Sequence, residues 1–153
     1  EIQAYDVKEV SKYSAIYAAQ KLQTSVIKSD VGYYIEELNG FPGVFVKYIN
    51  TMLSSEDILR MLEGKINRTI YLKECLTFAT PDGKTKQFLH TEKATIYKEA
   101  MGNGSTFDKI IVFEGDVLPK SMNTEEKNLK HFESQLKIYD EMAEYLEGEK
   151  EYE

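Results

Sequence analysis

Two places in this sequence combine residue types and spacing that could do chemistry. Asp30 stands at the head of the apolar run "VGYYI", which is followed by the Gly/Pro turn "NGFPG". A carboxylate at the end of a buried strand could hold a cation or activate a water molecule, whereas an Asp beside a turn can equally be a capping residue. Lys127 and His131 are four residues apart, so any helix that contains them presents both side chains on one face.

The composition limits the classes of protein to be considered. The chain has 153 residues, 42% of them hydrophobic and 29% charged, which is typical of one globular domain with a real core. A net charge of −7 argues against a nucleic-acid-binding protein, because binding phosphate backbones requires a basic surface. No apolar run is long enough to span a bilayer, and no signal peptide opens the sequence. The single cysteine, Cys75, gives no reason to expect an oxidising compartment, so a cytoplasmic protein is expected.

Periodicity and turn residues predict the elements that must position these side chains. An amphipathic helix is predicted over 7–22 with Asp6 as its N-cap, followed by two short extended pieces, "TSVIKSD" and "GYYIEEL". The rest should comprise a short helix from "SSEDILRMLEG", a long hairpin turning at "PDGK", a buried strand "KIIVFEG" and one long helix from Thr124 to about Glu147. This order predicts an α/β fold with a central, mixed, elongated and twisted sheet flanked by helices.

Several motifs in one register resemble the inosine triphosphate pyrophosphatase family. The segment "KSDVGYYIEELNGFPGVFVKY" is similar to the family's acidic pair, apolar strand and "ALNGFPG" turn. The segments "EIQAYD", "LEGKINRTIYLKECLTFATPDG", "STFDKIIVFEG" and "MNTEEKN" resemble four further family segments, in the same order. The resemblance covers nearly all of residues 1–153 and implies one ITPase-like α/β domain. It also implies that the family's N-terminal strand and phosphate loop would lie before Glu1.

The resemblance implies a reaction and a role for several residues. Family members hydrolyse non-standard purine nucleoside triphosphates (ITP, dITP and XTP) to the monophosphate and pyrophosphate, with a divalent cation, usually Mg²⁺. Asp30 would be both the metal ligand and the catalytic carboxylate. Phe107 would stack on the base beside Asp108, Lys127 would contact the nucleotide, and His131 would be near the base.

The sequence departs from the family pattern at positions that bear on this chemistry. Ala4 replaces a metal-binding Glu, and Ser29 replaces one acid of the acidic pair. The family's Ser-His-Arg, which reads the oxo edge of the purine, is replaced by "LKHFES", where His131 is one position out of register. With fewer carboxylates, a cation would be held more weakly. The alternative to an enzyme is therefore a weakened or inactive homologue that acts as a dimeric nucleotide-binding or interaction protein.

Competing structural interpretations apply to the same residues. Phe107 could be a core residue leading into a strand, and Lys127 could be a solvated lysine in the first turn of a helix. The Tyr33-Tyr34 pair and Tyr48 lie near the segment that forms the homodimer interface in the family, so a homodimer is expected, although core packing would explain these tyrosines equally well. The partners implied are a purine nucleoside triphosphate and a second copy of the chain, with no nucleic acid and no membrane.

Overall fold

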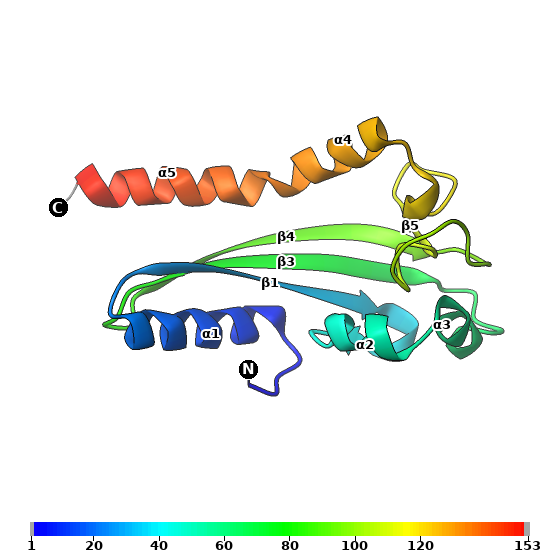
Figure 1. Cartoon of the computed structure of the whole chain (residues 1–153), viewed down its shortest axis with the longest axis horizontal. Helices are drawn as coiled ribbons and strands as arrows, with labels where there is room; N and C mark the ends of the chain where they lie inside the picture. The colour runs from blue at the N-terminus through cyan, green and yellow to red at the C-terminus, as the bar shows by residue number, and fades with distance from the viewer. Residues whose placement is uncertain (1, 152–153) are drawn as a thin grey trace.

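The computed structural model describes residues 2–151 and shows a long curved sheet with helices on both faces (Figure 1). The helices are α1 (Val7–Leu22), α2 (Val46–Met52), α3 (Ser55–Met61), α4 (Glu125–Gln135) and α5 (Lys137–Glu151), with short 3-10 helices at Glu36–Leu38 and Lys120–Met122. The strands are β1 (Val26–Ile35), β2 (Pro42–Gly43), β3 (Thr69–Ala79), β4 (Thr85–Ile96) and β5 (Ile111–Phe113). None of the helices within these residues is long and apolar enough to cross a membrane.

The strand order is β2-β1-β3-β4-β5. The α/β class and the long β3–β4 hairpin are confirmed, but every pairing in the described part of the chain is antiparallel, so the expected mixed sheet is wrong. The strand β3 runs antiparallel to both β1 and β4, so no parallel crossover connection is needed between them. Because β2 pairs only with Tyr33 and Tyr34, the remainder of β1 forms the edge of the sheet as described.

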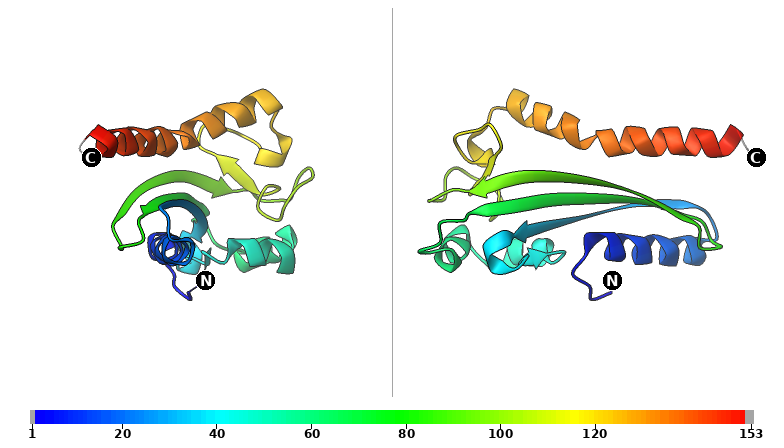
Figure 2. Two further views of the ribbon diagram at one scale, coloured as in Figure 1. Left: turned by 60° about the vertical axis from the view of Figure 1, so that its left-hand side comes forward. Right: turned by 180° about the vertical axis from the view of Figure 1, so that it is seen from behind.

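The helices form two layers. Figure 2 shows α1 to α3 on one side of the sheet and the α4–α5 pair on the other. Successive side chains of β1 point to opposite faces of the sheet, so each faces one of these two layers. The hydroxyl of Tyr34 accepts a hydrogen bond from the backbone N–H of Val7 at the start of α1 (3.1 Å), whereas Tyr33 packs on the other side. We call the two sides the α1 face and the α4 face.

Local signals explain most helix boundaries. Asp6 caps α1 by accepting a hydrogen bond from the backbone N–H of Lys8 (2.9 Å), as expected. Ser54 and Asp57 form a capping box at the start of α3. The predicted long helix is instead two helices, because the chain bends at Leu136 between α4 and α5. The sequence has neither Gly nor Pro at that point, so no local signal marks the bend.

The α4–α5 pair contacts the sheet through two different kinds of interaction. At one end, Ile138 and Met142 are buried against Leu76 of β3. Tyr145 adds edge-on ring contacts with Phe78 and Phe88. At the other end, α4 is held by polar contacts, while Leu129 and Phe132 remain 59% and 53% exposed. The exposed side chains leave a cleft beside α4.

Candidate active site

Asp30 lies within β1, not at its end. The two predicted extended pieces form one strand, and Asp30 pairs with Cys75 in the register of β1 and β3. The β-branched and aromatic residues around it favour a continuous strand. Its side chain is 11% exposed, and its Oδ1 lies 3.4 Å from the Nζ of Lys28. The turn-capping interpretation is therefore wrong, and so is the expected place of the carboxylate at the end of the strand.

Asp30 and the residues predicted on α4 lie on opposite faces of the sheet. Asp30 is on the α1 face together with Tyr34, by alternation. Its neighbour Val31 is on the α4 face, where it lines a cavity together with Tyr33. The edge of β1 is what separates the two faces at this point. A ligand that contacts both must therefore pass over this edge.

Lys127 and His131 are brought together, as their spacing predicts, by a residue that sequence reasoning missed. Asp116 follows β5, and its side chain is only 6% exposed. Its Oδ1 lies 3.0 Å from the Nζ of Lys127, and its Oδ2 lies 3.1 Å from the Nε2 of His131. Asn123 donates a further hydrogen bond to Oδ2 (3.2 Å). Asp116 thus fixes both predicted binding residues against the end of the sheet.

The electrostatics of Asp116 follow from these contacts. Burial alone would raise the pKa of its carboxyl group. The hydrogen bonds from Lys127, His131 and Asn123, together with the charge of Lys127, outweigh burial and lower that pKa below its ordinary value. Asp116 is therefore an anion at neutral pH that attracts the cationic end of Lys127.

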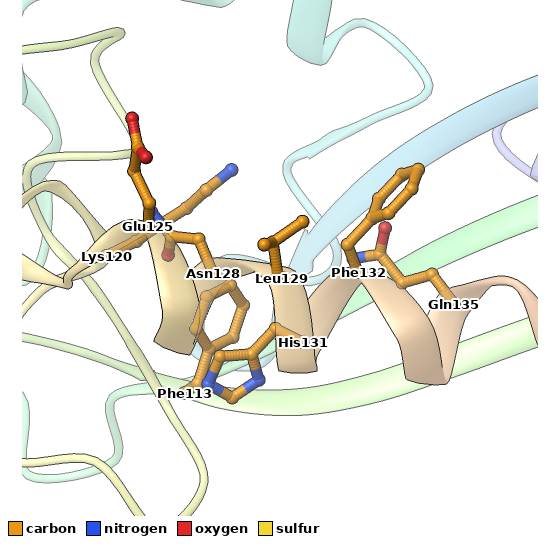
Figure 3. A pocket seen from close by; sticks show the side chains of 8 residues that line it. All are labelled: Phe113, Lys120, Glu125, Asn128, Leu129, His131, Phe132 and Gln135. Atoms are coloured by element: carbon orange, nitrogen blue, oxygen red, sulfur yellow. The ribbon is translucent and has the colours of Figure 1, made fainter.

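His131 is also held by its ring and by its second nitrogen. The ring lies against Phe113 of β5, with centroids 4.1 Å apart and planes inclined by 31°. Its Nδ1 lies 3.4 Å from Oε1 of Glu92 on β4. In Figure 3, Phe113 and His131 lie together at the wall of the cleft, and Leu129 and Phe132 extend from the same helix.

The cleft consists of two adjoining cavities on the α4 face. The larger, about 420 Å³, runs along α4 and lies in the usual size range of ligand sites (Figure 3). The smaller, about 150 Å³, lies over β1, β3 and β4 and is lined by Tyr33, His90, Glu92 and Asp108. Both cavities share the linings Phe113, Lys120 and Gln135, so we describe them together as the α4 cleft.

Phe107 and Asp108 differ in their surroundings. Phe107 is fully buried in the core, where its ring meets that of Tyr33 edge-on with centroids 5.4 Å apart. The core interpretation is thus confirmed, and in this conformation its ring offers no face for a base to stack on. Asp108 lines the α4 cleft and lies 3.4 Å from the Nζ of Lys120. Burial raises the pKa of the Tyr33 hydroxyl, and the charges of Asp108 and Glu92 raise it further.

The residues that would be needed for a metal centre are not assembled. Within residues 2–151, no group of three or more His, Cys, Asp or Glu side chains is placed so that it could hold a metal ion. Ser29 is on the α4 face, where its hydroxyl donates to Oε2 of Glu74 (2.6 Å), a carboxylate that also accepts from Tyr139 (2.8 Å). Glu74 is therefore occupied and on the opposite face from Asp30.

Comparison with known proteins now adds to this geometry. The model of the Ham1 family matches residues 1–134. The chain belongs to the Ham1 family. The resemblance to inosine triphosphate pyrophosphatases is thereby confirmed, since the curated relatives of this Ham1 chain have the name dITP/XTP pyrophosphatase.

Three curated relatives show how far the likeness extends. The protein of Saccharolobus solfataricus is 33% identical over 151 residues, which are 97% of this chain and 77% of that protein. The protein of Thermococcus kodakarensis is 35% identical over 84% of this chain and 70% of its own length. The protein of Methanopyrus kandleri is 34% identical over 76% of this chain, and the aligned region spans only 62% of that relative.

Solved structures support the fold. The Ham1 protein of Staphylococcus aureus has a TM-score of 0.77 and 24% identity, over 97% of this chain and 80% of its own. A dITP/XTP pyrophosphatase from Mycobacterium abscessus has a TM-score of 0.77 and 17% identity, over 88% of this chain and 76% of its own. These likenesses establish a Ham1 fold for the described residues.

Proposed function

We propose that this chain hydrolyses non-standard purine nucleoside triphosphates (ITP, dITP and XTP) to the monophosphate and pyrophosphate. The observation that carries the proposal is the pair Lys127–His131, which Asp116 fixes beside a cleft in a protein of the Ham1 family. The relatives are named dITP/XTP pyrophosphatases, and this name supplies the substrate class. The alternative, an inactive nucleotide-binding homologue, shares the cleft and differs only in turnover.

In this proposal the base and sugar occupy the α4 cleft. His131 lines the cleft, and Lys127 lies beside it because both side chains contact Asp116. The charge of Lys127 would favour an anionic nucleotide. The phosphates extend over the edge of β1 to Asp30, one residue from the cleft-lining Val31. There the carboxylate of Asp30 would accept the proton of the attacking water, which is the function of a general base. The proposed binding residues also include Asp108, at the floor of the cleft. Phe107 would support the floor from within.

A divalent cation is part of the family's chemistry, but the described residues do not form a metal site on their own. Mg²⁺ commonly keeps several waters and binds through one or two carboxylates together with substrate phosphates. We therefore propose that Mg²⁺ arrives with the triphosphate and that Asp30 is the single protein carboxylate near it. A homodimer is also proposed. Tyr48, which is 48% exposed, is available for it, whereas Tyr33 and Tyr34 are used within the chain.

The test is pyrophosphate release from ITP, XTP and ordinary dNTPs with Mg²⁺, comparing the wild type with Asp30→Asn. Loss of a general base should lower kcat by on the order of 10²- to 10⁴-fold. Lys28→Gln, which removes the ion pair of Asp30 but keeps the carboxylate, is the matched control. No turnover by the wild type would refute the enzyme and leave the binding homologue, while unchanged turnover in Asp30→Asn would refute the assignment of Asp30.

A further inference from the structure

The inner end of the α4 cleft holds two polar atoms whose hydrogen-bonding capacity is unused among the described residues. These are Oε2 of Glu92 and Nε2 of His90, both buried. They lie 3.9 Å apart, too far for a hydrogen bond to each other. Leaving a buried polar group unsatisfied costs about 1–3 kcal/mol, so a ligand that enters the cavity gains by bonding both atoms.

The strand geometry directs both side chains into the same cavity. His90 and Glu92 are two residues apart on β4, so they share a face of the sheet, and both line the 150 Å³ cavity. Their side chains are 20% and 15% exposed. The other oxygen of Glu92, Oε1, lies 3.4 Å from Nδ1 of His131, which orients the carboxylate.

The charge of the cavity decides which part of a nucleotide can enter it. Its charged lining consists of three acids, Glu74, Glu92 and Asp108, against two lysines, Lys73 and Lys120, and this excess of acids disfavours a phosphate group. Asp108 has a lysine partner, Lys120, whereas the ion-pair partners of Glu92 among the described residues are the histidines His90 and His131. A neutral group that presents a hydrogen-bond donor to Glu92 is therefore favoured over a phosphate group, and the edge of a base is such a group.

We propose that Glu92 and His90 read the N1–H and O6 edge of a 6-oxopurine. Oε2 of Glu92 accepts a hydrogen bond from N1–H, and Nε2 of His90, carrying its proton, donates to O6. Hypoxanthine and xanthine both present this donor–acceptor edge. Adenine presents the reverse, an N1 acceptor and an N6 donor, which places a lone pair against the carboxylate. The assignment rests on the proposed function for the nucleotide class and replaces the Ser-His-Arg that this sequence lacks.

Glu92 and His90 would separate 6-oxopurines from adenine but not from one another. Guanine has the same N1–H and O6, so Glu92 and His90 do not distinguish it from hypoxanthine. A site built to hydrogen-bond an edge rejects a base that lacks it, because the polar groups are left unpaired. Rejection of adenine is therefore the property to measure.

The experiment measures binding, so that it is independent of turnover. Dissociation constants of inosine and adenosine 5′-monophosphates are determined by titration calorimetry for the wild type, Glu92→Gln and His90→Ala. The wild type should prefer the inosine nucleotide by about 10- to 100-fold, the range for one hydrogen bond to a charged group. Glu92→Gln should abolish that preference, because an amide can both donate and accept. His90→Ala should weaken binding of the inosine nucleotide and leave that of the adenosine nucleotide unchanged.

The matched control is Glu9→Gln, an exposed acid in the first turn of α1, on the opposite side of the sheet from the α4 cleft (Figure 2). It should keep the base preference of the wild type. Equal binding of the two nucleotides by the wild type, no binding of either, or an unchanged preference in Glu92→Gln would each overturn the inference. Missing pyrophosphate release with the preference intact would instead count only against the proposed hydrolysis.

A modified nucleotide tests the same contact with the wild-type protein, so that no variant has to fold. N1-methylation of the inosine nucleotide removes the N1–H and leaves O6 in place. The wild-type protein should bind the methylated form about 10-fold or more weakly, since Oε2 of Glu92 then has no donor. Equal affinity for the two forms would overturn the assignment even if every variant at position 92 were unfolded.

Discussion

The Nζ atom of Lys127 lies 3.0 Å from Oδ1 of Asp116, a carboxylate whose side chain is 94% shielded from solvent. An exposed pair of this kind would contribute little to stability. Here the same carboxylate also bonds His131 and Asn123, so its removal disturbs three partners at once. The position of Lys127 is thus set by a residue outside its own helix.

Asp116→Asn should reduce both stability and nucleotide affinity. The amide keeps the shape but loses the charge that attracts Lys127, so the free energy of unfolding should fall by about 2 kcal/mol. KM for dITP should rise more than kcat falls, because the residues affected bind the substrate. Urea denaturation and steady-state kinetics measure the two effects. Glu126→Gln, which removes an exposed acid beside Lys127, is the control and should change neither by a comparable amount.

Acid should remove the contribution of Asp116 in a defined pH window. Its pKa in the folded protein is lowered, so its ionised form stabilises the fold fully above the ordinary value of 3.8 and loses this effect as pH falls through the lowered pKa. The difference in unfolding free energy between the wild type and Asp116→Asn should shrink as the pH falls below about 4. A difference that grows in acid would contradict the assigned ionisation.

Phe107→Ala should act through stability. The ring is fully buried against Tyr33. Removing it leaves a cavity and should lower the free energy of unfolding by about 3–5 kcal/mol. Phe107→Leu should cost less, because much of the volume is kept. If Phe107 supports the floor of the cleft only from within, Phe107→Leu should retain base preference in the binding assay. If a folded Phe107→Leu protein lost the base preference, that result would favour a direct contact between Phe107 and the base.

Thr124→Ala should loosen the start of α4. The hydroxyl of Thr124 accepts a hydrogen bond from the backbone N–H of Lys127 (3.2 Å), and an N-cap of this type contributes about 1 kcal/mol. Thr124→Ser should restore the bond. Because the ion pair with Asp116 still holds the Lys127 side chain, we expect a small change in affinity and a measurable change in thermal unfolding. Amide hydrogen exchange confined to the first turn of α4 would verify where the loosening occurs.

Local patterns in the sequence predicted the fold better than the site. The helix α1 and its cap, the helix α3 and the β3–β4 hairpin all follow from periodicity and from turn residues. The 7-residue helix α2 was missed, since no capping side chain marks its start at Phe45. The bend at Leu136 was missed because it depends on how the two helices pack, which is a tertiary effect.

The site was harder to predict because its residues meet across elements far apart in the sequence. The spacing of Lys127 and His131 was informative because four residues make one helical turn. Asp116 lies in "EGDVLP" after a short strand and looks like a turn residue there. Nothing local indicates that it is buried. Glu92 stands in a strand between polar neighbours, Thr91 and Lys93, so no alternation marks the face that it shares with His90, and only the cleft above them shows where they point.

The two attachments of the α4–α5 pair respond to different conditions. The α5 end is held by apolar burial around Met142 and Tyr145, which added salt leaves in place or strengthens. The α4 end combines the ring contact of His131 with Phe113 and the ion pair of Lys127 with Asp116, and the 46% exposure of Lys127 leaves that ion pair open to screening. Raising the ionic strength should therefore detach α4 from the sheet first, while α5 stays packed on it.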